Sequence, residues 1–382
     1  MSESVDCLIV GAGPAGIAAG LELTRHGWSV LLIDKADFPR DKVCGGFIGP
    51  ENKPLLSRYG VLDELLNQGA REVTHIHLST PDGNSVRIPM GSTKGEYALG
   101  FSRKMFDALL LKQARRQGIA FHDMTVIRKT VAREGSHHIA LKNMRTGMDW
   151  EIEARHLIRA TGAGHRSAHS SGRLFGVAAL FDQCRDMQSD VIMHFISQGH
   201  AGINRFEKDT VNVCYVIKEE LFCQCEGSHE KIWDVFLNSN PGMRRQMEGA
   251  RRLTPWKTTY LDLNTPRCFF DGTFYCAGDA VGLIHPVAGG GISMALSSGS
   301  MLGELLGQHR PQAVDARRLA RQYRGMWMQR FLAPCVVSHW AGALGHHRPL
   351  AETTIKLLKT NEVFIKALFN LFHKPTELKE CV

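Results

Sequence analysis

The chain has 382 residues, of which 43% are hydrophobic and 22% are charged. This length allows two domains or one large α/β unit, and the composition is ordinary for a globular protein. The net charge is +8, but the chain contains no nucleic-acid recognition motif, which argues against a dedicated nucleic-acid binder. It also contains no internal repeat and no low-complexity tract, which argues against a repeat array.

The ten cysteines are scattered along the chain. None forms a C-x-x-C pair, and Cys223-Gln-Cys225 has no matching second pair, so we expect no metal site. This pattern is typical of reduced thiols, and the first strand begins almost at the N-terminus, so no signal peptide is expected. The sequence therefore predicts a cytoplasmic protein.

A glycine-rich turn near the start organises the chain. Residues 5–10 predict a short buried strand, and residues 17–26 predict a helix. The G-x-G-x-x-G turn between them consists of Gly11, Gly13 and Gly16. A second strand, residues 29–33, ends in Asp34, about 20 residues further on, where a carboxylate can bind ribose hydroxyls. The combination predicts a dinucleotide site with its phosphates at the helix N-terminus; a turn without a ligand is the alternative.

Residues 35–50 form a loop rich in glycine, proline and charge. Its Cys44-Gly45-Gly46 segment indicates backbone that passes close to a flat or bulky group, with an ordinary connection as the alternative. Residues 51–68 predict one or two short helices. Residues 72–79 and 85–88 flank a P-D-G-N turn, which predicts a hairpin that begins a second sheet.

The middle of the chain predicts one helix and then several strands. The helix begins after the N-cap Ser102 and ends at Gly118. The first strands are expected at residues 119–128, 138–142, 149–153 and 156–161. The last of these returns to the first sheet, whereas residues 175–217 hold three more strands of a mixed sheet. Residues 228–238 predict a helix.

A second glycine cluster lies far from the first. Residues 273–276 predict a strand, Gly278-Asp279 a turn, and Gly289-Gly290-Gly291 the start of a buried helix over residues 292–306. Asp279 can accept hydrogen bonds from ligand hydroxyls. The bare N–H groups at the helix start form a site for negative charge.

The tail from residue 314 onward is expected to be helical. Residues 331–344 carry no charge, but Pro334, Ser338, His339 and Gly342 argue against a membrane span. Residues 355–372 are apolar with lysines beside them, namely Lys356, Lys359, Lys366 and Lys374. Packing against the body is the favoured interpretation, and peripheral contact with a membrane surface is the alternative.

Together, the two glycine clusters and Asp34 resemble the FAD-binding fold of aromatic hydroxylases, the class A flavin monooxygenases. The segments Phe38-Pro39-Arg40, Cys44-Gly45-Gly46 and Gly278-Asp279-Ala280-Val281-Gly282 resemble the geranylgeranyl reductase branch more closely. Flavin-dependent halogenases are further relatives. The resemblance covers residues 1–310 and implies an α/β fold: a Rossmann-like, glutathione-reductase-type FAD-binding domain, an interleaved mixed-sheet substrate domain and a helical C-terminal tail.

On this basis the expected domains are discontinuous. The FAD-binding domain takes residues 1–71, 97–165 and 268–310, the substrate-binding domain residues 72–96 and 166–267, and the helical region residues 311–382. The resemblance implies that FAD is bound by Gly11, Gly13, Pro14, Ala15, Gly16, Asp34, Lys35, Arg40, Cys44, Gly45, Gly46, Arg103, Val126, Thr161, Gly162, Gly278, Asp279, Pro286, Gly289, Gly290, Gly291 and Ile292. For Arg103 the alternative is a solvated arginine at a helix start.

The sequence also departs from these families. Aromatic hydroxylases carry histidine at Gly282 and asparagine at Ser293, and their Asp-Gly motif is here Thr161-Gly162. The reductases' aromatic–Trp–aromatic–Pro string is not visible near residues 215–221. The halogenases' G-x-W-x-W-x-I-P string is also missing, so halogenation is not expected.

The expected chemistry is redox. In the first interpretation, reduced flavin gives a hydride from N5 to a C=C bond of a hydrophobic small molecule, an isoprenoid, polyketide or aromatic, and Cys44 supplies the proton. The alternative is an O2-dependent monooxygenase. His285 either polarises the substrate or tunes the flavin, with a structural role as the alternative for both His285 and Cys44.

No second nucleotide fingerprint exists, so NAD(P)H docks transiently or an electron-donor protein reduces the flavin. A flavoprotein that binds RNA or a membrane surface is the third hypothesis, based on the net charge of +8.

Overall fold

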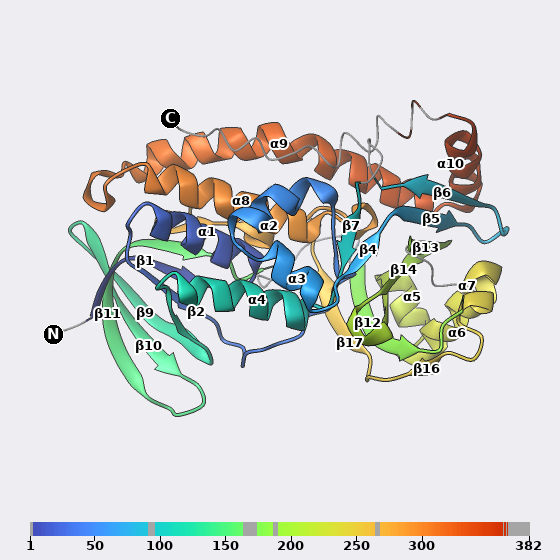
Figure 1. Cartoon of the computed structure of the whole chain (residues 1–382), viewed down its shortest axis with the longest axis horizontal. Helices are drawn as coiled ribbons and strands as arrows, with labels where there is room; N and C mark the ends of the chain where they lie inside the picture. Colours follow the sequence, from blue (N-terminus) through green and yellow to red (C-terminus); the bar gives the residue numbers. More distant parts are fainter. Residues whose placement is uncertain are drawn as a thin grey trace.

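The computed structural model describes residues 3–90, 96–162, 174–185, 190–263, 268–361, 363 and 365. Figure 1 shows two sheets at opposite ends of the molecule, with the long helix α9 (Ala316–Gly345) running along one edge between them. The C-terminal lysines Lys366 and Lys374 of the predicted basic segment lie outside the described residues.

The first sheet is a parallel sheet with an antiparallel extension. Its order is β8-β2-β1-β11-β10-β9, and β18 pairs with β11. The strands are Glu3–Val10 (β1), Val30–Ile33 (β2), Ala120–His122 (β8), Thr125–Arg133 (β9), Ser136–Asn143 (β10), Asp149–Arg159 (β11) and Phe274–Cys276 (β18). β1 pairs in parallel with β2 and β11, which confirms the predicted Rossmann-like arrangement.

Two strand predictions in this sheet need correction. Residues 149–153 and 156–161 do not form separate strands, because β11 runs without a break as it leaves β10 and continues beside β1. Residues 119–128 do not form one strand, because Met124 adopts a φ of +48° and turns the chain between β8 and β9.

Two glycine-containing helices cover one face of the first sheet. Helix α1 (Pro14–Arg25) packs against α8 (Gly291–Gly307). A Cβ on Gly299 would collide with the carbonyl oxygen of Ala15, and one on Gly303 with that of Ala19. The small residues therefore let the backbones of the two glycine-cluster helices approach each other directly.

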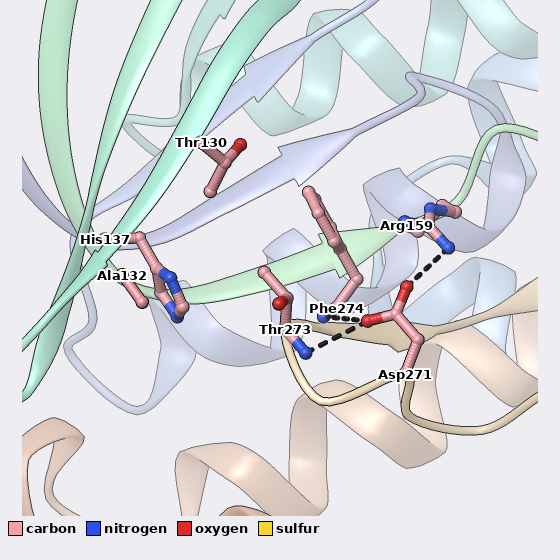
Figure 2. A pocket seen from close by; sticks show the side chains of 7 residues that line it. All are labelled: Thr130, Ala132, His137, Arg159, Asp271, Thr273 and Phe274. Atoms are coloured by element: carbon pink, nitrogen blue, oxygen red, sulfur yellow. Dashed lines mark hydrogen bonds and ion pairs between the residues drawn. The ribbon is translucent and has the colours of Figure 1, made fainter.

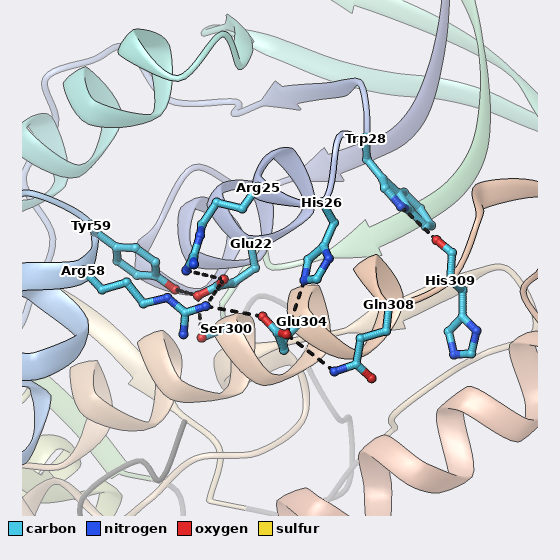
Figure 3. A network of polar contacts seen from close by, with 10 residues as sticks. All are labelled: Glu22, Arg25, His26, Trp28, Arg58, Tyr59, Ser300, Glu304, Gln308 and His309. Carbon is cyan, nitrogen blue, oxygen red and sulfur yellow. Dashed lines mark hydrogen bonds and ion pairs between the residues drawn. The ribbon is translucent and has the colours of Figure 1, made fainter. Parts of the chain in front are cut away.

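A buried carboxylate ties these two helices to a third. Figure 3 shows Glu22 of α1 accepting hydrogen bonds from the hydroxyl of Tyr59 at 2.9 Å and from that of Ser300 at 3.0 Å. Arg58 at the end of α2 (Lys53–Arg58) lies 3.1 Å from Glu22. Burial raises the pKa of Glu22, although these hydrogen bonds oppose the shift. The network fixes the helical layer and contains none of the predicted site residues.

The second sheet is larger than predicted. Its order is β16-β12-β15-β14-β13-β5-β6, with β17 also paired to β12. The strands are His75–Ser79 (β5), Ser85–Pro89 (β6), Leu174–Asp182 (β12), Asp190–Ile196 (β13), Gly199–Arg205 (β14), Val211–Lys218 (β15), Arg251–Arg252 (β16) and Lys257–Leu261 (β17). Residues 175–217 hold four strands instead of three, since the hairpin of β13 and β14 turns within residues 196–199.

Short elements connect the two sheets. A small sheet of order β3-β7-β4 lies between them. Its strands are Phe47–Ile48 (β3), Arg71–Val73 (β4) and Ala98–Gly100 (β7), and the remaining helices before α8 are Leu62–Asn67 (α3), Arg103–Arg116 (α4), Glu219–Gln224 (α5), His229–Ser239 (α6) and Pro241–Gln246 (α7). As predicted, the hydroxyl of Ser102 caps α4 by accepting a hydrogen bond from the N–H of Met105.

The described C-terminal region is helical, as predicted. Helix α10 (Arg348–Thr360) buries Ile355 and Leu358 against Val86 of β6. This contact confirms, for the described part, that the segment packs against the body. None of the helices in the described ranges is long and apolar enough to cross a membrane.

Candidate functional site

The first glycine turn has the geometry that a bound pyrophosphate needs. Gly11 has a φ of +111°, and a Cβ there would collide with the carbonyl oxygen of Ala160. A Cβ on Gly16 would collide with the carbonyl oxygen of Gly11. By contrast, a Cβ on Gly13 would meet only Nη2 of Arg40, at 3.6 Å. The space in front of Gly13 is therefore bounded by a cation, which suits an anionic ligand.

The N-terminus of α1 has no capping side chain and no acidic residue in its first turn. Pro14 and Ala15, its first two residues, are buried. The positive end of the helix dipole therefore faces the Gly13 turn without a competing carboxylate from the helix itself.

Asp34 stands at the end of β2 beside this turn. One carboxylate oxygen accepts a hydrogen bond from the N–H of Ala12 at 2.8 Å, and the other accepts one from Ala36 at 2.9 Å. Lys35 is exposed beside it. Val126 follows Thr125, whose N–H donates to the carbonyl oxygen of Asp34 at 2.8 Å. Three of the predicted FAD-binding positions thus lie around one strand end.

Two arginines converge on Asp107 of α4. Arg103 makes a bidentate pair with it through two hydrogen bonds of 2.8 Å, and Arg40 reaches it at 3.0 Å and Asp34 at 3.7 Å. Arg103 is buried, so it is not the solvated helix-start residue of the alternative interpretation. Burial alone would lower the pKa of Arg103, but the Asp107 carboxylate outweighs it and raises the pKa, with a smaller contribution from the Cys44 sulfur.

The loop of residues 41–46 crosses the second sheet, and we call it the crossing loop. Asp41 pairs with Lys257 of β17 at 2.9 Å, and Val43 lies 3.7 Å from the position of a Cβ on Gly176 of β12. Further along, the Cys44 and Gly46 carbonyl oxygens accept hydrogen bonds from two asparagine amides. These donors are Asn212 of β15 at 3.0 Å and Asn204 of β14 at 2.9 Å. The loop therefore contacts four neighbouring strands in order and holds the Cys44 thiol against Arg103.

The second glycine cluster meets the first in space. A Cβ on Gly278 would lie 2.8 Å from Cβ of Ala15, and the N–H of Gly278 donates to the hydroxyl of Ser298 at 2.9 Å. Asp279 lies 3.7 Å from Nζ of Lys42. Gly162, which follows Thr161 after β11, has the same lysine amine 3.1 Å from its Cβ position. Three segments, each about 120 residues from the next in sequence, thus meet around the Lys42 amine.

The start of α8 is the second helix N-terminus of the site. Gly289 takes a left-handed φ of +64°, and Gly290 is an N-cap without a side-chain hydrogen bond. A Cβ on Gly291 would meet no atom of the described chain within 4 Å, whereas Ile292 is buried. The predicted anion-binding helix end is therefore open, as a ligand edge would require.

His285 belongs to a buried group of histidines. Its Nδ1 accepts the N–H of Val287 at 3.2 Å, just after Pro286 begins a single helical turn. Burial, then His346 and His339, lower the pKa of His285 to about 3. His200 of β14 lies 3.1 Å from His346 between ring nitrogens. The His285 side chain is therefore neutral and fixed by its own loop.

A separate hollow lies away from this site. It has a volume of about 460 Å³ and is bounded by β9, β10, β11 and β18. Figure 2 shows that Arg159 on one wall pairs with Asp271 at 2.8 Å. The hollow contains none of the predicted cofactor-binding residues. Among the described residues no cluster of three or more metal-ligating side chains occurs, and the described cysteines are free thiols.

Two helix N-termini, two glycine clusters that touch and a carboxylate at the end of β2 define a dinucleotide-binding flavoprotein of the oxidoreductase class. A family model described as an FAD binding domain matches residues 4–321, and the chain belongs to this family. These residues fit FAD, because the positions that would bind its negatively charged groups lie beside Arg40 and at two helix N-termini without capping side chains.

The curated relatives have different activities. Conditioned medium factor receptor 1 of Dictyostelium discoideum is 25% identical over 86% of this chain and 68% of its own length. A 1H-pyrrole-2-carbonyl-[peptidyl-carrier protein] brominase of Pseudoalteromonas luteoviolacea is 23% identical over 82% and 80%. A digeranylgeranylglycerophospholipid reductase of Methanococcus vannielii is 25% identical over 86% and 84%. The family is therefore shared across reductases and halogenases.

Solved structures agree on the fold. The flavin-dependent brominase Bmp2 has a TM-score of 0.83 at 17% identity, covering 97% of this chain and 94% of the brominase. PqsL, a probable FAD-dependent monooxygenase from Pseudomonas aeruginosa, has a TM-score of 0.74 at 15% identity, covering 93% and 100%. At these identities the likeness supports the fold alone.

Sequence reasoning missed several residues around the site. Lys42 is one of several charged residues in its loop, and no sequence motif near it indicates a contact with Asp279. Asn204 and Asn212 are polar residues inside apolar strands, and that exception to the strand pattern is the signal that could have found them. Asp107 lies four residues after Arg103 on α4, and this i,i+4 spacing is the signal that could have found it. His200 gave no signal, because its partner His346 lies 146 positions away.

Proposed function

We propose that this flavoprotein reduces a C=C bond of a hydrophobic small molecule, an isoprenoid, polyketide or aromatic. Bound FAD in its reduced form would supply the hydride from N5 to one carbon of the double bond. Cys44 would supply the proton from its Sγ to the other carbon, so that the two hydrogen atoms balance the saturated bond.

The observation that carries this proposal is the position of Cys44. The crossing loop lies between the glycine clusters and the second sheet, and Asn212 fixes the Cys44 carbonyl. Arg103 contacts the thiol. The guanidinium would stabilise the thiolate that remains after Cys44 has given its proton to the substrate.

NAD(P)H is proposed as the electron donor. The chain has no second nucleotide fingerprint, so the donor would dock transiently beside the flavin, or a partner protein would deliver the electrons. The proposed location is the cytoplasm. The described cysteines are free thiols, which supports a reducing compartment.

Oxygen transfer to an aromatic or polyketide is the second candidate. The open start of α8, at Gly290 and Gly291, is compatible with it, because a helix end that accepts flavin negative charge serves both reactions. Membership of the FAD binding domain family is compatible with either.

The test distinguishes C=C reduction from oxygen transfer by the mass of the product. The purified protein, loaded with FAD and reduced by NADPH, is mixed with a geranylgeranyl-chain lipid in two parallel reactions, one without air and one in air. The mass of the product is then measured by mass spectrometry. A gain of two hydrogen atoms supports reduction. Product that forms only in air and gains one oxygen atom overturns it in favour of the monooxygenase.

Two cysteine variants test whether Cys44 is the proton donor. Cys44→Ala should keep FAD bound and lower turnover on the order of 100-fold, the usual contribution of a general acid. Cys184→Ala, which changes a half-buried thiol far from the crossing loop, is the matched control and should leave turnover unchanged. Equal turnover of Cys44→Ala and wild type would mean that Cys44 only packs.

A further inference from the structure

The outer face of α9 carries an exposed apolar row. Leu332, Val336, Trp340 and Leu344 follow one another at intervals of four residues, so they share one side of the helix. Their exposed fractions are 39%, 47%, 67% and 36%. The opposite side of the same stretch is buried, at Phe331, Cys335, Ser338 and Gly342. The part of the chain that the structure describes therefore leaves this row uncovered.

Helix α10 adds two exposed leucines at the same end of the molecule. Leu350 is 43% exposed and Leu357 is 54% exposed, although Ile355 and Leu358 of the same helix are buried. Figure 1 shows α10 beyond the end of α9, next to β5 and β6. We call the six exposed side chains of the two helices the apolar row.

Basic residues flank the apolar row. The first half of α9 exposes Arg318, Arg321 and Arg324, and α10 exposes Lys356 and Lys359. Helix α9 itself contains no aspartate or glutamate over its 30 residues. No carboxylate of the described chain forms an ion pair with these three arginines. The surface is therefore apolar in its centre and positively charged at both sides.

We propose that the apolar row and its basic flanks dock on an anionic lipid surface. Tryptophan prefers the membrane–water interface, where its ring is buried and its N–H stays hydrated. Leucine and valine side chains enter the acyl boundary, while arginine and lysine attract anionic headgroups. The net charge of +8 adds to this attraction over the whole molecule.

A second copy of the chain fits this surface less well. A row of residues 332–344 is about 18 Å long at the helical rise per residue. A stable dimer interface needs roughly 20 to 30 residues from each partner. An antiparallel contact between two α9 helices would also bring further arginines together around the small apolar centre.

The docked helix would lie directly behind the loop of residues 285–290 that precedes α8, which we call the flavin-side loop. The backbone N–H of His285 donates to the hydroxyl of Ser338 on the buried side of α9 at 3.2 Å, and a Cβ on Gly342 would collide with the His285 ring. The lipid surface would therefore be one helix thickness from the proposed reaction site. The docking itself does not depend on the proposed reaction, and the binding assay below measures it without turnover.

Vesicle sedimentation tests the proposal. The FAD-loaded protein is mixed with vesicles of phosphatidylcholine containing phosphatidylglycerol, or of phosphatidylcholine alone, at low and at high salt. We expect binding to the anionic vesicles that weakens at least tenfold in high salt. The double variant Val336→Glu/Trp340→Glu should lose binding at least tenfold. Its matched control is Met148→Glu, which alters a 59% exposed methionine in the turn between β10 and β11.

A second measurement keeps the test valid if the double variant does not fold. Brominated phosphatidylcholine in the anionic vesicles should quench part of the tryptophan fluorescence of the wild type, and Trp340→Phe should remove that part. Wild type that stays in the supernatant, or quenching that is unchanged in Trp340→Phe, overturns the proposal. A wild-type dimer in solution that Trp340→Glu converts to a monomer also overturns it, because a second copy would then occupy the row.

Discussion

The side-chain amide of Asn212 donates to the carbonyl oxygen of Cys44 over 3.0 Å, although the two residues are 168 positions apart. Asn204, which is paired with Asn212 across the neighbouring strand, makes the same contact with the carbonyl oxygen of Gly46. Two amides on adjacent strands of the second sheet thus hold a loop of the cofactor-side sheet. This contact makes the position of Cys44 depend on both sheets.

Asn212→Ala should loosen the crossing loop without removing the cofactor. The half-buried Cys44 would lose the donor to its carbonyl oxygen, which costs at most about 3 kcal/mol, the upper value for a fully buried acceptor. We expect FAD content to stay unchanged, turnover to fall and the melting temperature to drop by a few degrees. Asn238→Ala on the exposed side of α6 is the control and should change none of the three. Wild-type turnover in Asn212→Ala would show that the crossing loop is held by its other contacts.

Gly11→Ala should abolish FAD binding. Gly11 has a φ of +111°, and its new Cβ would collide with the carbonyl oxygen of Ala160, so β1 and β11 would have to separate. We expect a colourless protein or none in soluble form, measured by the flavin absorbance per chain. Gly325→Ala is the matched control, because its Cβ would meet no described atom within 4 Å. That variant should be more stable by roughly 1 kcal/mol, since alanine is the better helix former.

Asp107→Asn should destabilise the protein strongly. It leaves the buried guanidinium of Arg103 without its carboxylate partner, and breaking a buried pair costs about 3 to 5 kcal/mol. Arg40 would also lose its contact with Asp107. Chemical denaturation should show a lower midpoint, whereas Asp63→Asn on the exposed face of α3 should keep the wild-type midpoint. If the midpoint of Asp107→Asn were unchanged, the pair would contribute no net stability.

The sequence predicted the local parts of the fold well. Strand β1, the glycine turn and α1 follow from residues within one segment, and so does the Ser102 cap of α4, because hydrophobic period and capping chemistry are local signals. The break between β8 and β9 was missed, since Met124 is a residue type that seldom adopts a positive φ. Domain boundaries and the roles of individual site residues stay predictions.

The long-range parts of the site had no such signal. Lys42 and Asp279 lie 237 positions apart, and their pairing results from how β11 and β18 bring distant loops to one sheet end. The histidine group arises in the same way, because His200, His285 and His346 come from β14, a flavin-side loop and the end of α9. Hydrophobic periodicity records which face of an element is buried but not which element covers it.

The histidine group should make the protein sensitive to mild acid. Burial lowers the pKa of His285 to about 3 and that of His346 to about 4, and it lowers the pKa of His200 as well. Their ordinary pKa is about 6.5, so between pH 6.5 and 4 the unfolded chain binds protons that the folded chain does not. The unfolding free energy therefore rises with pH in this window, and it decreases as the pH is lowered through the window. His339 and Lys218, which lie close to the group, disfavour its protonation further.

The variant His346→Gln isolates this effect. It can keep a hydrogen bond to His200 but cannot take up a proton, so the decline of the melting temperature from pH 7 to pH 4.5 should become shallower. One fewer titrating histidine reduces the slope by up to about 1.4 kcal/mol per pH unit. His309→Gln, which changes an exposed histidine after α8, should keep the wild-type slope. If His346→Gln and His309→Gln gave equal slopes, the acid sensitivity would have to come from carboxylates and not from this buried group.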